Sequence, residues 1–309
     1  MIEFETIQDE IQDLNALLAQ HERALASHPG EKSLRANINT LKRRRQILED
    51  DFLEAAARVE ADVCSYRLIP NERRPTILAV SKVLGGFQSL FSLVYDAIKE
   101  GPKKRATLSK EVLEETSLAF AYSFTGSVGF VMTLPNERLL FGETYLDQTM
   151  QLVFEMAKTT APEQVAEFVK KLGAPPVRAI YKWAGDHVEY GLSADIEWRR
   201  KEQIRSSLFI QKPQLEQLRE AIAKTSDETE EEMEVQGSLV GADVTRKSFH
   251  LETVGGGEIQ GSFAHAISVE QTVELPKPYM AKIRKRTKII YSMEDEQTSY
   301  FLLHLAPLA

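Results

Sequence analysis

Apolar residues recur at steps of three, four and seven along the N-terminal part of the chain, on either side of a break at Ser27-His28-Pro29-Gly30. Such steps place apolar side chains along one narrow seam of a helix. Pro and Gly in the break end one helix and turn the chain. The pattern predicts an antiparallel helical hairpin, a short coiled coil, over residues 1–62. We expect its seam to take part in self-association, and the seam residues are Ile7, Ile11, Leu14, Leu18, Leu34, Ile38, Leu41, Leu48 and Phe52.

Arg45 occupies the one position in the second stripe, between Leu41 and Leu48, that is not apolar. A charge in a seam costs stability, but it can fix the register of the helices or meet a carboxylate. Asp13 is one carboxylate that it could meet.

Residues 65–225 combine helical patterns with alternating ones, which predicts an α+β domain. A helix opens at Pro75, and its apolar face runs to Gly101-Pro102. Next, the uncharged segment from Ser117 to Leu134 alternates large and small side chains around a Gly-Ser turn. We expect a buried β-hairpin there, with Leu118, Phe120, Tyr122 and Phe124 on one face. Both faces would be covered, one by helices and the other by a layer that could come from another subunit.

The rest of this domain continues the mixture of periods. Helical patterns predict helices at 145–158, 162–172, 176–190 and 213–224. Short alternating stretches predict strands at 194–199 and 206–211.

A composition shift then marks a domain boundary. Residues 226–234 are mostly acidic and carry too little apolar surface to build a core, so we expect an exposed linker. The strand-like segments that follow are 237–244, 246–253, 258–263, 268–275, 279–293 and 299–305. So many short strands within residues 235–309 are typical of a small β-barrel of the SH3-like or OB-like type.

Composition narrows the classes of protein. The chain has 309 residues, 43% hydrophobic and 27% charged, which fits a folded protein of more than one domain. Its formal net charge of −8 gives no overall attraction to nucleic acid or anionic lipid. Cys64 is the single cysteine, so no disulfide forms within one chain, and we expect a packed thiol. The acidic N-terminus does not resemble a signal peptide, and we expect a soluble, cytoplasmic protein.

The sequence contains no recognisable motif for catalysis, cofactor binding or metal binding. The histidines lack metal-ligand spacing with cysteines or acids, and the carboxylates lie in runs on exposed faces. We therefore predict no catalytic residue, no cofactor and no metal site.

One basic strand does suggest binding. Alternation places Lys282, Arg284, Arg286 and Lys288 on one face of a strand, with Lys285 beside them. Positive charges about 7 Å apart repel one another unless an anion neutralises them. The anion could be nucleic-acid phosphate or an acidic protein partner, or the cations could pair with Glu270 and Glu274 across a neighbouring strand.

The sequence thus predicts a non-enzymatic, self-associating adaptor or regulatory subunit of a cytoplasmic complex, a dimer or larger. Its C-terminal barrel would bind the protein partner. One alternative is a nucleic-acid-binding protein that uses the basic strand at 282–288. Another is an enzyme whose site is assembled from scattered residues, because catalytic sites are defined by geometry rather than by sequence position.

Overall fold

The computed structural model describes residues 2–71, 74–105, 107–124, 128–136, 142–243, 245–263, 274–291 and 297–308. The chain forms two compact units, Met1–Lys224 and Thr225–Ala309. The helices within the described residues are α1 (Ile2–Ser27), α2 (Lys32–Arg58), α3 (Ile77–Glu100), α4 (Lys110–Glu115), α5 (Tyr145–Ala157), α6 (Pro162–Leu172), α7 (Ala174–Tyr190) and α8 (Lys212–Ala223). The mixed α+β class expected from the sequence is confirmed.

The first unit is built on a five-stranded antiparallel sheet with the order β2-β3-β1-β4-β5. Its strands are β1 (Ala61–Pro70), β2 (Ala119–Phe124), β3 (Val128–Pro135), β4 (Leu192–Arg200) and β5 (Gln203–Ile210). β1 lies at the centre and pairs with both β3 and β4. The sequence analysis extended the helical hairpin to residue 62 and predicted no strand here, whereas α2 ends at Arg58 and β1 begins at Ala61. Both faces of a central strand are buried, so β1 shows little alternation.

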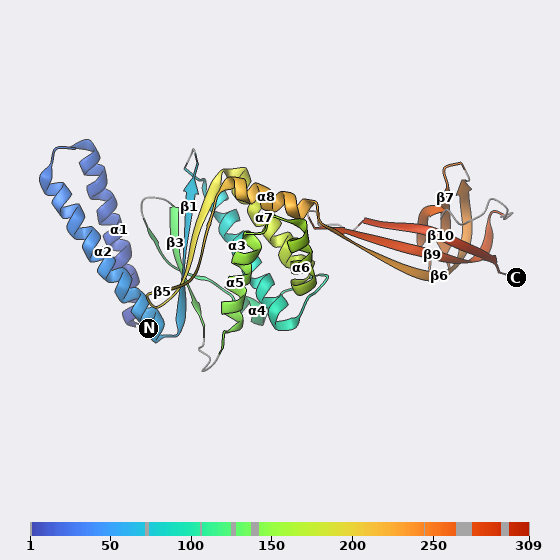
Figure 1. The fold of residues 1–309 in the computed structure, drawn as a ribbon, viewed down its shortest axis with the longest axis horizontal. Coiled ribbons are helices and arrows are strands. Elements are labelled where there is room, and N and C mark those ends of the chain that lie inside the picture. The colour runs from blue at the N-terminus through green and yellow to red at the C-terminus, as the bar shows by residue number, and fades with distance from the viewer. Residues whose placement is uncertain are drawn as a thin grey trace. The chain divides into compact units, whose positions relative to one another are not determined.

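Each face of this sheet has its own cover (Figure 1). Helices α3, α5 and α7 pack on one face, where Tyr66 meets Phe87 with ring centroids 5.0 Å apart and Trp198 meets Phe91 at 6.1 Å. The hairpin of α1 and α2 packs on the other face over β1, β2 and β3. The second layer over the uncharged β-hairpin is therefore supplied by this chain's own helices.

The hairpin and the sheet share one apolar core. It includes Ile11 and Leu14 of α1, Phe52 of α2 and Tyr122 of β2. A register shift between Phe120 and Tyr122 turns Tyr122 inward, to 5% exposure, and leaves Phe120 58% exposed. The sequence analysis placed these two rings on one face, and the bulge is the reason that they differ.

Helix α3 has the length and apolar composition of a membrane-crossing helix, and among the described residues it alone does. Its Phe87, Leu90, Phe91 and Val94 side chains are buried in the core of the first unit. Helix α3 therefore contributes one apolar face to that core.

The second unit is a β-structure of long and short strands. They are β6 (Ser226–Asp243), β7 (Ser248–Thr253), β8 (Glu258–Phe263), β9 (Lys277–Ile290) and β10 (Gln297–Pro307). The order is β10-β8-β7-β6-β9, and β10 also pairs with β9. The contact between β10 and β8 consists of the parallel pairs Phe301↔Ser262 and Leu302↔Phe263. The strand expected at 268–275 falls mostly outside the described residues.

Residues 226–234 form the first half of β6 rather than an exposed linker. They pair in register with β9, from Ser226↔Ile290 to Glu234↔Lys282. The sequence analysis judged this acidic run by its own composition. The charges that order it lie about 50 residues further along the chain, on β9.

Candidate functional site

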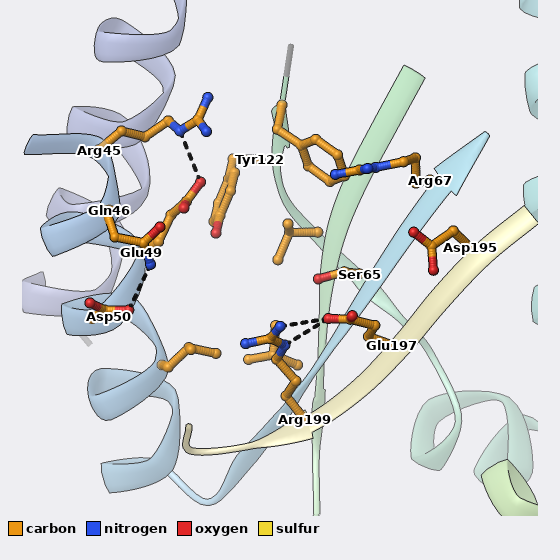
Figure 2. A pocket seen from close by; sticks show the side chains of 14 residues that line it. Arg45, Gln46, Glu49, Asp50, Ser65, Arg67, Tyr122, Asp195, Glu197 and Arg199 are labelled. Atoms are coloured by element: carbon orange, nitrogen blue, oxygen red, sulfur yellow. Dashed lines mark hydrogen bonds and ion pairs between the residues drawn. The ribbon is translucent and has the colours of Figure 1, made fainter. Parts of the chain in front are cut away.

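A polar cleft of about 340 Å³ lies between α2 and the sheet, at the margin of the area that the helical hairpin covers (Figure 2). Helix α2 forms one wall, β4 forms the other, and β1 and the β2–β3 pair form the floor. We call it the α2–sheet cleft. Its lining residues are Arg45, Gln46, Glu49, Asp50, Leu53, Val63, Ser65, Arg67, Tyr122, Phe124, Val131, Asp195, Glu197 and Arg199.

The helical wall of the cleft begins where the apolar seam of α2 is interrupted. Arg45 occupies a seam position, and its Nε lies 3.2 Å from Oε1 of Glu49, one turn further along. Both side chains are about three-quarters buried, at 25% and 23% exposure. Arg45 therefore pairs with Glu49. The carboxylate that the sequence analysis suggested was Asp13. This ion pair lies where apolar side chains would otherwise continue the core.

The wall formed by β4 also carries an ion pair. Strand alternation turns Ile196 and Trp198 into the helical core, so Glu197 and Arg199 face the cleft. Arg199 donates from Nη2 and Nε to Oε2 of Glu197, at 2.6 Å and 3.0 Å. The two walls of the cleft thus carry separate, internally matched charge pairs.

The floor carries charges that are not matched in this way. Arg67 of β1 lies directly opposite Asp195 of β4 in the strand register, as Ser65 lies opposite Glu197. Within the described part of the chain, neither Arg67 nor Asp195 forms an ion pair. The guanidinium of Arg67 instead lies over the Phe124 ring, 5.3 Å from its centroid (Figure 2).

Burial shifts the pKa of acidic groups in the cleft. It raises the pKa of Glu49, because desolvation disfavours the carboxylate, while Arg45 opposes the shift. Burial also raises the pKa of Tyr122 well above its usual range, and the charge of Glu49 adds to the effect. Tyr122 therefore keeps its phenolic proton and can act as a hydrogen-bond donor in the cleft.

The basic strand singled out from the sequence lies on β9, and the acidic half of β6 neutralises it. Arg286 lies 2.6 Å from Glu230 and 2.8 Å from Glu228. Arg284 contacts Glu232 at 3.1 Å, and Lys282 reaches the same carboxylate at 2.8 Å. We call this arrangement, residues 228–234 of β6 against 282–288 of β9, the charge ladder.

The remaining basic residues follow the same register. Lys288 lies opposite Glu228 in the strand register, and Lys285 lies opposite Glu231. The counter-charges predicted from the sequence are different ones. Glu274 instead binds Lys277 at 2.6 Å, and Glu270 lies outside the described residues.

The seam residues expected to mediate self-association are used within the chain. Ile11, Leu18, Ile38 and Phe52 are at most 5% exposed, Leu14 and Leu48 are buried, and Ile7, Leu34 and Leu41 are partly buried. Several of them pack on the sheet of the same unit. They therefore offer little free apolar surface to a second copy.

A buried polar network that the sequence analysis missed joins the sheet to α7. Tyr66 and His187 are hydrogen-bonded at 2.8 Å, and Nδ1 of His187 lies 3.0 Å from the Leu192 carbonyl. A carbonyl only accepts, so Nδ1 carries the proton and Nε2 accepts from Tyr66. Burial lowers the pKa of His187 to about 4, which keeps the ring neutral. On the same strand, burial raises the pKa of the Cys64 thiol to about 12.

A second buried network ties β4 to β1 and α5. Arg200 binds Asp62 through two contacts of 2.8 Å and 2.9 Å and also binds Asp147 at 2.7 Å. Asn136 and Trp198 donate further hydrogen bonds to Asp62. With its hydrogen bonds made inside the protein, this network has the character of a structural clamp.

Across the described residues, no group of three or more His, Cys, Asp or Glu side chains could hold a metal ion. Comparison with protein-family models, with curated proteins and with solved structures gives no match. The functional argument therefore rests on the geometry of the cleft.

Proposed function

We propose that this chain is a non-enzymatic adaptor or regulatory subunit that receives a ligand in the α2–sheet cleft. As expected from the sequence, the proposal includes a cytoplasmic location, self-association, and a C-terminal unit that is a small barrel of the SH3-like or OB-like type and contacts a protein partner. Since the helical seam is buried, self-association would use other surfaces of the chain.

The observation that carries the proposal is the largely buried ion pair of Arg45 and Glu49, which interrupts the apolar stripe of α2 at the cleft. Replacing a largely buried ion pair by well-packed apolar side chains is often neutral or stabilising, by about 1–4 kcal/mol. The raised pKa of Glu49 indicates that its charged form is held at a cost. Charged groups kept at such a cost in a concave site are typical of binding sites.

The charge ladder does not favour the nucleic-acid alternative. Binding to a phosphate backbone depends on cations that are free to replace counterions. On β9, Lys282, Arg284 and Arg286 already contact carboxylates of β6. We expect no shift of DNA or RNA in a gel at roughly 50 mM salt, where backbone contacts are screened least. A shift that disappears when these cations are replaced by Ser would restore that alternative.

The proposal can be tested by removing the buried ion pair of the cleft. The double variant Arg45→Leu/Glu49→Leu makes this change, and Glu10→Leu/Arg44→Leu is the control, because that pair lies on the hairpin outside the cleft at 3.4 Å. Each protein would be heated with fractions of a cytoplasmic extract, and the unfolding midpoint recorded. We expect a fraction that raises the midpoint of the wild type and the control but leaves that of Arg45→Leu/Glu49→Leu unchanged. An equal response from all three would contradict the proposal.

A further inference from the structure

The floor of the α2–sheet cleft holds one cation and one anion side by side, Arg67 and Asp195, and neither forms an ion pair within the described residues. Arg67 and Asp195 face each other across β1 and β4, so their Cβ atoms are about 4.5–5.5 Å apart. The other charged groups of the lining have partners, since Arg199 binds Glu197, Arg45 binds Glu49, and Asp50 accepts a hydrogen bond from Gln46. The floor therefore differs from the walls in having charges available to a ligand.

Phe124 of β2 and Gly129 of β3 together position the Arg67 side chain. Gly129 lies opposite both Arg67 and Phe124 in the strand register. A Cβ at residue 129 would overlap the Phe124 ring, so only glycine lets this ring lie flat across β3. The ring in turn supports the Arg67 guanidinium, and a cation over an aromatic face is attracted to it. The position of the cation is therefore fixed before any ligand binds.

We propose that the cleft binds a zwitterionic small molecule of the α-amino acid class, with its carboxylate on Arg67 and its ammonium group on Asp195. A guanidinium presents two N–H groups that match a carboxylate, and a carboxylate accepts from an ammonium group. The two charges of an α-amino acid are separated by only a few bonds, which suits groups on directly opposite strand residues. The volume of about 340 Å³ lies within the usual range for small-molecule sites.

Ligands with a single charge fit this floor less well. The lining holds slightly more carboxylates than guanidinium groups, so a simple anion meets repulsion from Asp195 and Glu197. A simple cation leaves Arg67 uncompensated. Apolar side chains of Leu53 and Val131 line the space beside the floor and can receive the ligand's side chain.

This inference rests on the proposed function, and its test separates the two. The twenty common L-amino acids would be screened one at a time, at about 10 mM, for a rise in the unfolding midpoint of the full chain. The best binder would then be compared with its amide, which lacks the carboxylate, and its N-acetyl derivative, which lacks the ammonium charge. We expect each derivative to bind at least about tenfold more weakly, as is usual when a charged hydrogen bond is lost.

Variants assign each charge to its residue. Arg67→Gln should abolish the preference for the amino acid over its amide, and Asp195→Asn should abolish the preference over the N-acetyl derivative. Gly129→Ala should weaken binding without touching the ligand, because it displaces the Phe124 ring. Arg44→Gln and Asp51→Asn are matched controls outside the cleft and should bind as the wild type does.

The outcomes are distinct. If none of the twenty amino acids binds, the zwitterion assignment is wrong, while a response to extract fractions that Arg45→Leu/Glu49→Leu loses would still support a binding cleft. If an amino acid binds but Arg67→Gln and Asp195→Asn keep both preferences, the ligand lies elsewhere and the assignment also fails. If extract and amino acids alike leave every variant equal, both proposals fall.

Discussion

The α2–sheet cleft and the charge ladder are both rich in charge, and they use it in different ways. In the ladder, acids of β6 oppose bases of β9 in one continuous register, and the cationic side chains are 37–46% exposed. In the cleft, the charges come from separate segments of the chain, and the pair on α2 is about three-quarters buried. The ladder's charges pair β6 with β9, whereas the cleft's charges line the space between α2 and the sheet.

This difference shows how to separate structural charge from functional charge. Exposed ion pairs add a little stability, and their charges are already neutralised, so they offer no free charge to a ligand. Charges that interrupt an apolar stripe, such as Arg45 and Glu49, cost stability. On the cleft floor, Arg67 and Asp195 form no ion pair in the described part of the chain. The charge ladder is therefore interpreted as structural, and the charges of the cleft are interpreted as a binding site.

The largest effect is expected from breaking the α2 pair. Arg45→Leu alone leaves the Glu49 carboxylate beside new apolar surface and should lower the free energy of unfolding by about 2 kcal/mol, less than for a fully buried pair. Adding Glu49→Leu should reverse the loss and raise stability above wild type by about 1 kcal/mol. Urea unfolding followed by tryptophan fluorescence measures this, because Trp183 and Trp198 both lie in the first unit. A double variant less stable than the single one would show that the cleft is not held open at a cost.

Acid should affect the two regions in opposite directions. The raised pKa of Glu49 means that the folded protein favours the protonated form, so its contribution to stability falls as pH rises from about 4.5 through the raised value. Lys282 and Arg284 lower the pKa of Glu232, so that contribution is present above about 4.5 and is lost as pH falls through the lowered value.

Acidification toward pH 4 should therefore weaken amide protection in residues 228–234 while the Glu49 contribution improves. Hydrogen exchange read by mass spectrometry follows the first, and tryptophan-detected unfolding of wild type against Glu49→Gln follows the second. Glu49→Gln should flatten the pH dependence of the first unit. A pH profile unchanged by this substitution would contradict the assignment to Glu49.

Salt should distinguish the ladder from the cleft by a smaller effect. Raising the ionic strength to about 1 M shortens the screening length to about 3 Å and weakens exposed pairs most. Amide exchange in residues 228–234 should accelerate, as it should when Lys282, Arg284 and Arg286 are changed to Ser. Exchange in β1 at the cleft floor should not change. Equal acceleration in both regions would mean that the ladder is not held by its charges.

The smallest effect on stability is expected at the cleft floor. Arg67→Gln removes a partly exposed contact with the Phe124 ring, which contributes about 0.5–1 kcal/mol at such sites. The unfolding midpoint should therefore change little, in contrast with Arg45→Leu. A large loss would show that Arg67 is structural, and the same urea titration decides.

Sequence pattern was a good guide to elements whose partner is close along the chain. The stripes of residues 1–62 became α1 and α2, and the uncharged segment at 117–134 became β2 and β3. The strands expected at 194–199 and 206–211 became β4 and β5, and these paired with each other. In each case, local periodicity and the turn chemistry between the two elements carried enough information.

The pattern failed where the partner is distant in sequence. β1 was missed because its pairing partners, β3 and β4, lie far along the chain, and the acidic start of β6 was mistaken for a linker because its cations lie on β9. The cleft could not be read at all, since its lining extends from Arg45 to Arg199. Only Arg45, as a charge in an apolar stripe, gave a local sign of it.

The contact between α1 and β2 has a consequence for how the chain avoids its own copies. β2 ends the sheet on one side, and an unpaired strand edge invites another chain to add to it. Two side chains of α1 reach this edge: Gln12 donates to the Ala121 carbonyl of β2 at 3.1 Å, and Asn15 donates to the Ser123 carbonyl of β2 at 2.7 Å. These amides occupy acceptors that an intruding strand would need. Helix α1 thus covers part of this edge, and we expect its proteolytic removal to expose β2 and to promote edge-to-edge aggregation.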